Sequence, residues 1–317
     1  MTVCIAMLFR WNYGSADQPN HGVAAITASD RMMTSADVEY EPLQKKVATL
    51  GKSLLLVSGD LNTHSQAIQD THAQIAGKPD AKPLDIALIY GRSIQAINLR
   101  NAEAVILAPL GLNTDTFNVQ QRDLSEGYVD TLRRQLQEFR GPDVEAIIAG
   151  SDGKEVHLYT IDHMGVVNCL DDTGFAAIGI GAWHARSRLM QIGYTNTRIF
   201  APALASIFAA KKTAEIAPGV GEATDIHVIL RDSISPLWDP AGAKLVELYS
   251  RYESERLALE GRIAAELQTF LDTPNPEGKP NVATEGQAGG HPQHNESAGP
   301  DAAEAARGNE GGKESGD

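Results

Sequence analysis

The second residue of the chain, Thr2, carries the side chain whose chemistry is most readily put to use. A threonine hydroxyl is a weak nucleophile that needs an adjacent base. If Met1 is removed, as expected before so small a residue, the α-amine of Thr2 can be that base, with an unperturbed pKa of about 7.7–8.0. Threonine after an initiator methionine is also common in proteins that make no such use of it. Thr2 alone therefore does not decide a function.

Two pairs of charged residues stand at the boundaries of apolar segments. Asp30 and Arg31 close the second apolar segment of the chain, and Lys45 and Lys46 precede the third. Such pairs are often a turn or a solvated surface feature. Their placement, one acid closing a predicted strand and one lysine opening the next, makes Asp30 and Lys46 candidates for a site with Thr2.

Other catalytic and metal-binding patterns do not fit this sequence. Gly179-x-Gly181 lacks a third glycine and the context of a dinucleotide-binding fold, and no GxSxG, HExxH or Walker motif is present. His64 and His72 lie eight residues apart on a predicted helix, and we interpret both as surface histidines rather than zinc ligands. Nucleophilic chemistry at Thr2 needs neither metal nor organic cofactor, so we predict none.

Composition excludes several classes of partner. The chain has 317 residues, 42% of them hydrophobic, which suits one medium-sized soluble domain with an extension. Its 41 Asp and Glu against 27 Lys and Arg give a net charge of -14, which repels a phosphate backbone. No basic stripe interleaved with aromatic residues offsets this charge. We expect no nucleic acid partner.

Cysteine content and hydropathy indicate the compartment. The chain has 2 cysteines, too few for a disulfide framework, which favours a reducing environment. Residues 1–9 are apolar enough to suggest the core of a signal peptide. However, no basic residue precedes them and no small-residue cleavage site follows at the expected distance. No apolar run reaches the roughly 18 residues that would span a bilayer. We therefore expect a cytoplasmic protein without membrane segments.

Short apolar segments and helical patterns divide residues 1 to 240. Strands are predicted at Thr2–Phe9, Gly22–Ser29, Ser53–Ser58, Ala102–Leu107, Glu145–Gly150, Val156–Asp162 and Asp225–Arg231. Helices are predicted at Asn62–Ile75, Pro83–Leu99, Glu126–Phe139, His184–Ile192 and Arg198–Ala214. Two pairs of consecutive helices, within 62–99 and 184–214, lie between groups of strands, which is unlike the strict alternation of a doubly wound sheet.

The last quarter of the chain differs in composition from the preceding part and contains two distinct segments. Ala241–Leu271 has apolar residues at helical spacing among many charges, which predicts an exposed amphipathic helix. Residues 273–317 contain no aromatic residue, no Leu and no Ile, and cannot offset the conformational entropy lost on folding. We predict a domain at 1–240, a helix at 241–272 and a disordered tail at 273–317.

Two groups of motifs occur in order in the first quarter of the chain. The first is Thr2 to Ile5, followed after an insertion by Gly22 to Thr34, a strand that ends in Ser, Asp, Arg and then Thr three residues after the Arg. The second is Lys45 to Val47, followed by Leu54 to Asp60, an apolar strand that ends in a glycine turn. A third group occurs later.

The third group consists of a Gly-Ser-Asp-Gly hairpin at 150–153, an L-Y-x-x-D strand at 158–162 and an A-I-G-x-G helix entry at 177–181. In this order and spacing the three groups resemble the proteasome family, meaning its β-type core subunits and their bacterial relatives. The resemblance covers residues 2 to about 232. Each motif is modest by itself, whereas the ordered set is specific.

The resemblance implies a fold and a catalytic group. The fold is a four-layer αββα sandwich of the α+β class, that of N-terminal-nucleophile hydrolases. Thr2 would be the nucleophile, Lys46 would keep the Thr2 amine neutral, and Asp30 would hold Lys46 charged and oriented. Gly59 would offer its backbone N–H to the oxyanion.

The resemblance also implies a substrate and an assembly. Thr34 would pair its backbone with an extended substrate, and Met33, Val57 and Ser58 would border the pocket for the residue before the scissile bond. The substrate would be a peptide or an unfolded protein, cleaved inside a self-assembled homo-oligomer. Because the first strand starts at residue 2, with no helix before it, we expect a β-like subunit.

The sequence departs from the family at two places. Ile180 and Ala182 replace two serines of the helix-entry turn, and residues 217–222 lack the family's Asp and Ser. Glu215 or Asp225 could supply the missing acid. Two alternatives therefore stay open, namely a non-catalytic scaffold or ring protein of the same fold and a small-molecule amidase with the same nucleophile.

Overall fold

The computed structural model describes residues 2–14, 20–35, 38–40, 46–78 and 80–273. They fall into one compact unit that ends at Tyr252 and a second that begins at Glu253. The predicted division at residues 240 and 272 stays a prediction. The tail, from residue 274 onward, lies outside the described residues.

Two five-stranded antiparallel sheets form the centre of the first unit. The first sheet has the order β10 (Phe175–Ile178), β1 (Cys4–Asn12), β2 (His21–Ser29), β11 (Asp225–Ile229), β12 (Ile234–Pro236). The second has the order β5 (Val47–Leu50), β6 (Ser53–Gly59), β7 (Val144–Ser151), β8 (Val156–Ile161), β9 (Val167–Cys169). A separate hairpin pairs β3 (Met33–Ser35) with β4 (Val38–Tyr40).

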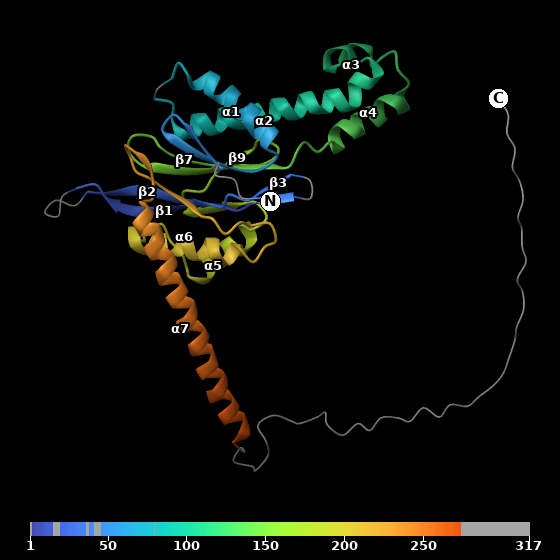
Figure 1. Cartoon of the computed structure of the whole chain (residues 1–317). Coiled ribbons are helices and arrows are strands. Elements are labelled where there is room, and N and C mark those ends of the chain that lie inside the picture. Colours follow the sequence, from blue (N-terminus) through green and yellow to red (C-terminus); the bar gives the residue numbers. More distant parts are fainter. Residues whose placement is uncertain (1, 15–19, 36–37, 41–45, 79, 274–317) are drawn as a thin grey trace, which may run out of the picture. The chain divides into compact units, whose positions relative to one another are not determined.

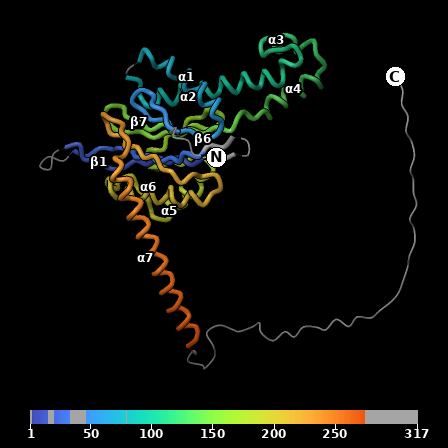
Figure 2. Tube along the Cα trace, in the orientation of Figure 1, coloured from blue at the N-terminus to red at the C-terminus, as the bar shows by residue number. Residues whose placement is uncertain are grey.

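Helices cover the outer face of each sheet. Helices α1 (Leu61–Ile75) and α2 (Pro83–Ala102) lie on one side, and α5 (Ala182–Gln191) and α6 (Phe200–Ala214) lie on the other (Figures 1 and 2). The layers are therefore helix, sheet, sheet, helix. The predicted four-layer αββα sandwich of the α+β class is confirmed.

Strand β1 shows how the layers are held together. Ile5 and Met7 belong to the core shared with α5 and α6, whereas Ala6 and Leu8 belong to the core between the two sheets. Because successive side chains of a strand point to opposite faces, both faces of β1 are buried. This explains why the sequence is continuously apolar there and does not alternate.

The strand predicted at Ala102–Leu107 is wrong. Ala102 ends α2, and Glu103–Leu107 form a π-helix followed by a 3₁₀ turn at Ala108–Leu110 and by α3 (Thr114–Gln120) and α4 (Glu126–Glu138). A short apolar run cannot be told from a buried helical segment by periodicity alone. The run instead supplies Leu107 to a small core of its own, completed by Phe117, Val129 and Leu132.

The sequence analysis did not predict the shortest elements. These are β3, β4, β5, β9, β10, β12 and α3. The six strands have 3 or 4 residues each, too few for a periodic pattern to stand out from the neighbouring turns. β5, β9, β10 and β12 each pair with a longer strand, whereas β3 and β4 pair with each other.

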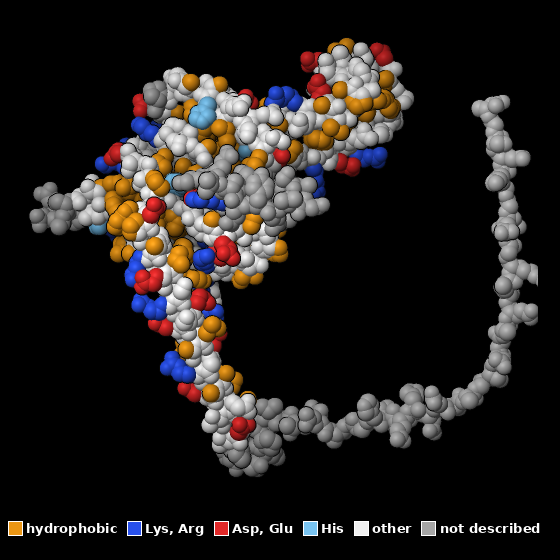
Figure 3. All heavy atoms as spheres, viewed as in Figure 1, with side chains coloured by type: hydrophobic (Ala, Val, Ile, Leu, Met, Phe, Trp, Pro, Cys, Tyr) orange, Lys and Arg blue, Asp and Glu red, His pale blue; other side chains and the backbone are white. Residues whose placement is uncertain are grey.

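The helix predicted at Ala241–Leu271 is confirmed as α7 (Asp239–Asp272), and none of its 34 residues is buried. Hydrophobic side chains lie among charged ones along it (Figure 3). Within the part of the chain that the structure describes, no helix is long and apolar enough to cross a membrane.

The small core around Phe117 predicts a region that unfolds independently. Phe117→Ala should remove about 3–5 kcal/mol of local stability, because four buried side chains have few neighbours to compensate. Native-state hydrogen exchange should show loss of protection in α3 and α4 while β6 and β7 stay protected. Val119→Ala, at a position 75% exposed on the same helix, is the control and should change nothing.

Candidate active site

Asp30 lies directly after β2 and extends the pairing of β1 with β2 by one step. Its backbone N–H donates to Val3 O (3.2 Å), and the Val3 N–H donates to Asp30 Oδ1 (3.1 Å). The carboxylate thus takes the place of a carbonyl at the end of the ladder. Its second oxygen, Oδ2, accepts N–H bonds from Met32 (3.3 Å) and Gly221 (3.0 Å).

Thr2 and Lys46 meet at the same carboxylate. Lys46 Nζ donates to Thr2 Oγ1 at 2.6 Å and to Asp30 Oδ1 at 3.1 Å, and the Thr2 hydroxyl donates to Asp30 Oδ1. The backbone of Lys46 is anchored to β6, since its carbonyl accepts the Val57 N–H (3.4 Å). The structure therefore brings together the three residues predicted as the catalytic group.

The three side chains are almost completely enclosed. Thr2, Asp30 and Lys46 are 3%, 0% and 6% exposed. A buried charge is tolerated only when it is paired and hydrogen-bonded, and Asp30 meets both conditions through Lys46 and its backbone donors. The low local dielectric strengthens the effect of the Lys46 ammonium on the Thr2 oxygen.

The turn between β10 and α5 closes over the backbone of Thr2. The Gly181 N–H donates to Thr2 O (3.3 Å), and the Gly179 N–H donates to Glu145 Oε2 (2.8 Å). A Cβ atom at Gly179 would lie 2.4 Å from Thr2 O, and its φ of 86° also favours glycine. Ile180 is 48% exposed, so the family's first serine is replaced by a side chain that faces solvent.

The segment that lacks the family's Asp and Ser supports Asp30 with backbone instead. The Gly221 N–H binds Asp30, and the carbonyl oxygens of Gly221 and Glu222 accept bonds from Lys211 Nζ at 2.7 and 2.8 Å. Lys211 is fully buried in α6, and burial lowers its pKa while Glu215, at 2.5 Å, acts in the opposite direction.

Both acids suggested as a replacement bind basic side chains. Asp225 forms two hydrogen bonds to the Arg31 guanidinium, at 2.6 and 2.8 Å, and Glu215 binds Lys211 and Lys212. Lys211 was missed by the sequence analysis. Its position one turn after Ile207 and Phe208, on the buried face of an apolar helix, was the available signal.

Gly59 ends β6 with a φ of 105°, and a Cβ atom there would lie 2.0 Å from Asp143 O. The Asp60 N–H donates to Asp143 O (2.9 Å), so hydrogen-bonded pairs with β7 fall on alternate residues that do not include Gly59. The Gly59 N–H is therefore turned toward the other side of β6, where the Val57 N–H donates to Lys46 O.

The predicted substrate-binding residues lie in two elements. Val57 and Ser58 are buried in β6, next to Gly59. In the β3–β4 hairpin the backbone of Met33 pairs with Tyr40 and that of Thr34 with Glu39. The side chains of Met33 and Thr34 lie outside the described residues, and their roles in substrate binding stay a prediction.

Cys4 is the one thiol near this site among the described residues. Its Sγ donates to Val57 O at 3.5 Å, and burial, with a further contribution from Asp30, raises the pKa of the thiol to about 12. A thiol that stays protonated is a poor nucleophile. Cys4 therefore packs in the core between the two sheets and is not a candidate nucleophile.

His64 is not the surface residue that we predicted. It is 1% exposed, whereas His72 on the same helix is exposed as expected. His64 Nδ1 lies 2.6 Å from Tyr90 Oη, and Nε2 lies 2.9 Å from Ser58 O. The signal was its spacing from Ala67 and Thr71, which lie three and seven residues further on along the buried face of α1.

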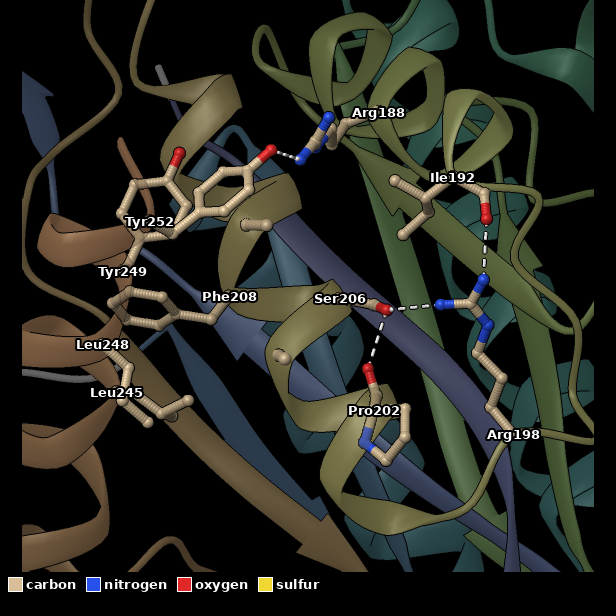
Figure 4. Close-up of a pocket in the computed structure, with 12 residues that line it drawn as sticks. Arg188, Ile192, Arg198, Pro202, Ser206, Phe208, Leu245, Leu248, Tyr249 and Tyr252 are labelled. Carbon is tan, nitrogen blue, oxygen red and sulfur yellow. Dashed lines mark hydrogen bonds between the residues drawn. The ribbon is translucent and has the colours of Figure 1, made fainter. Parts of the chain in front are cut away.

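A separate groove of ≈ 430 Å³ lies between α5, α6 and the beginning of α7 (Figure 4). Phe208, Leu245 and Tyr249 form much of its apolar wall, and Arg188 donates to the Tyr252 hydroxyl at its rim. Among the residues predicted for catalysis or substrate binding whose side chains the structure describes, none lines it.

Comparison with known proteins finds solved structures of similar architecture. Anbu (ancestral beta-subunit) from Yersinia bercovieri matches with a TM-score of 0.52 and 11% sequence identity, over 81% of this chain and 97% of that one. The chain has a proteasome-like fold. No family model matches the sequence, and no curated protein does. At 11% identity the similarity establishes the fold alone.

The ion pair predicts a large effect of Asp30 on stability. Asp30→Asn should lower the free energy of unfolding by about 3–5 kcal/mol, because Lys46 would be left buried without a countercharge. Urea denaturation measures this. Asp80→Asn, which breaks the exposed pair with Lys52, is the control and should cost less than about 1 kcal/mol. Equal losses in the two variants would contradict the structure.

Burial of His64 predicts a dependence of stability on pH. Burial lowers the pKa of His64, so below about pH 6.5 the unfolded chain takes up a proton more readily than the folded chain. The free energy of unfolding should therefore fall as the pH decreases from 7 to 5. His64→Gln cannot titrate, and its loss of stability over the same interval should be smaller. Urea denaturation at both pH values gives the comparison.

Proposed function

We propose that the protein is an N-terminal-threonine hydrolase that cleaves peptide bonds. The observation that carries this proposal is the contact of 2.6 Å between Lys46 Nζ and Thr2 Oγ1, with Asp30 Oδ1 3.1 Å from the same ammonium. A hydroxyl held against a buried positive charge is stabilised as it becomes an alkoxide. The proteasome-like fold supports the same class of chemistry.

Removal of Met1 supplies the base. While Met1 is attached, the nitrogen of Thr2 is an amide that cannot accept a proton, and the hydroxyl donates to Asp30 instead. Cleavage of the Met1–Thr2 bond converts this amide into an α-amine on the same residue as Oγ1, joined to it through Cα and Cβ. The positive charge of Lys46 disfavours protonation of that amine, which keeps it available as a base.

The reaction would proceed in two steps. The amine takes the Thr2 hydroxyl proton as Oγ1 bonds to the substrate carbonyl carbon, and the Gly59 N–H donates to the oxygen that gains the charge. The C–N bond then breaks, and the amine's proton passes to the leaving nitrogen. Water, deprotonated by the same amine, attacks the resulting ester and regenerates Thr2.

The substrate and assembly follow from the same proposal. The edge of the β3–β4 hairpin would pair with an extended peptide or unfolded protein, with Thr34 in contact with its backbone. Met33, Val57 and Ser58 would border the pocket for the residue before the cleaved bond. The fold also supports oligomeric assembly, which would restrict access to Thr2.

A non-catalytic ring or scaffold protein is the second candidate. Ile180 and Ala182 offer no hydroxyl at the turn that closes over Thr2, and this favours a role without chemistry. The buried ion pair would then serve stability alone. A small-molecule amidase with Thr2 as nucleophile would differ only in its substrate, and hydrolysis of simple amides but not of fluorogenic peptides would favour it.

Covalent labelling tests the proposal. Intact mass should show that Met1 is absent, and a β-lactone probe should add one mass equivalent, located at Thr2 by peptide mapping. Lys46→Met should react more slowly, on the order of 100-fold, the effect expected when one preorganised electrostatic group is lost. Thr2→Ala should not react.

The control is Thr2→Ser, which keeps a hydroxyl and should be labelled. Equal labelling of wild type and Thr2→Ala would disprove the role of Thr2. A protein that keeps Met1 and does not react would support the scaffold.

A further inference from the structure

We propose that His64 is a positioning residue that orients the peptide group between Ser58 and Gly59. His64 Nε2 lies 2.9 Å from the Ser58 carbonyl oxygen, inside the protein and one turn into α1. This inference rests on the proposed function, in which the Gly59 N–H stabilises the oxyanion. It assigns a task to a histidine that takes no part in the proton transfers at Thr2.

The argument starts from the planarity of the peptide bond. The Ser58 carbonyl and the Gly59 N–H belong to the same rigid, trans peptide group, so they point in opposite directions. A group that holds the carbonyl oxygen therefore also fixes the direction of the N–H. His64 contacts the side of this peptide that faces away from the substrate.

The hydrogen-bond pattern defines the tautomer of His64. The Ser58 carbonyl can only accept, so Nε2 must carry the hydrogen. The unprotonated Nδ1 then accepts the hydroxyl of Tyr90, 2.6 Å away. Tyr90 is fully buried, and burial raises the pKa of its hydroxyl, which keeps the donor protonated. Tyr90 thus holds the ring in the one form that can donate to Ser58.

Strand pairing holds this peptide from the side of β7, where Ser58 lies opposite Glu145 at a hydrogen-bonded position, and His64 adds a side-chain donor to the same carbonyl. Gly59 is the last residue of β6 and has a φ of 105°, a conformation in which glycine has more freedom than other residues. The start of α1 is fixed nearby, because Asp60 caps the helix by accepting the Thr63 N–H at 2.8 Å. His64, one turn further along, therefore reaches Ser58 from a rigid element.

Hydrogen bonding to the carbonyl has a second consequence. Donation to Ser58 O polarises the peptide group and makes the Gly59 N–H a stronger donor, since hydrogen bonds in a chain reinforce one another. The chain runs from Tyr90 through His64 to Ser58 and ends at the N–H that faces the Thr2 side of β6. Tyr90, His64 and Ser58 are buried, where such reinforcement is greatest.

The kinetic experiment separates reactivity from binding. The rate constant for acylation of Thr2 by a β-lactone, measured at saturation, should fall about tenfold or more in His64→Ala, while the reversible binding constant of the lactone stays unchanged. His64→Gln, whose amide can donate to Ser58, should recover part of the rate. Tyr90→Phe removes only the hydroxyl and should lower the rate by about threefold, so it decides the question if His64→Ala does not fold.

Thr71→Val is the matched control, because it removes a buried hydrogen bond to Ala67 O on the same helix without touching Ser58. It should leave the rate unchanged. Equal losses in Thr71→Val and His64→Ala, or a wild-type rate in His64→Ala or Tyr90→Phe, would overturn the inference.

A second measurement does not depend on catalysis. The ¹³C shift of the Ser58 carbonyl should move upfield in His64→Ala and stay unchanged in Thr71→Val, because only the first loses a donor to that oxygen. Absence of labelling in wild type would disprove the proposed function. An unmoved carbonyl shift would separately disprove the contact on which the role of His64 depends.

Discussion

The ion pair between Asp30 and Lys46 constrains every element around Thr2. A carboxylate and an ammonium buried 3.1 Å apart are stable only if their remaining hydrogen-bonding capacity is also used. Asp30 obtains three backbone donors, from the start of β1, the residues after β2 and the turn before β11. The ends of strands distant in sequence must therefore meet at one carboxylate, and the two-sheet sandwich allows this.

The sequence predicted the long elements well, because their apolar residues indicate which faces are buried. The central strands β1, β2, β6 and β7 are apolar on both faces, and the helices on either side of the sandwich have a clear polar and apolar side. The failure at Ala102–Leu107 arose because a six-residue apolar run satisfies both a strand and a buried helical turn. Only the packing of Leu107 against α3 and α4 distinguishes them.

The candidate site was predictable to the extent that it resembles a family pattern. Thr2, Asp30 and Lys46 lie up to 44 residues apart, and no periodicity could have placed them in contact. His64 and Lys211 were missed for a related reason. The burial of each is visible in its helix, but the carbonyl groups that each one binds, at Ser58 and Gly221, belong to strands and turns that only the tertiary structure brings near.

The edge strands of both sheets are short. The outer strands β5, β9, β10 and β12 have 3 or 4 residues, whereas the inner strands β1, β2, β6 and β7 have 7 to 9. The part of β1 that extends past β10 is occupied by the carbonyl groups of Gly174 and Arg198. Little continuous backbone is thus offered for another chain to extend either sheet. Short edge strands of this kind limit edge-to-edge aggregation between copies of the chain.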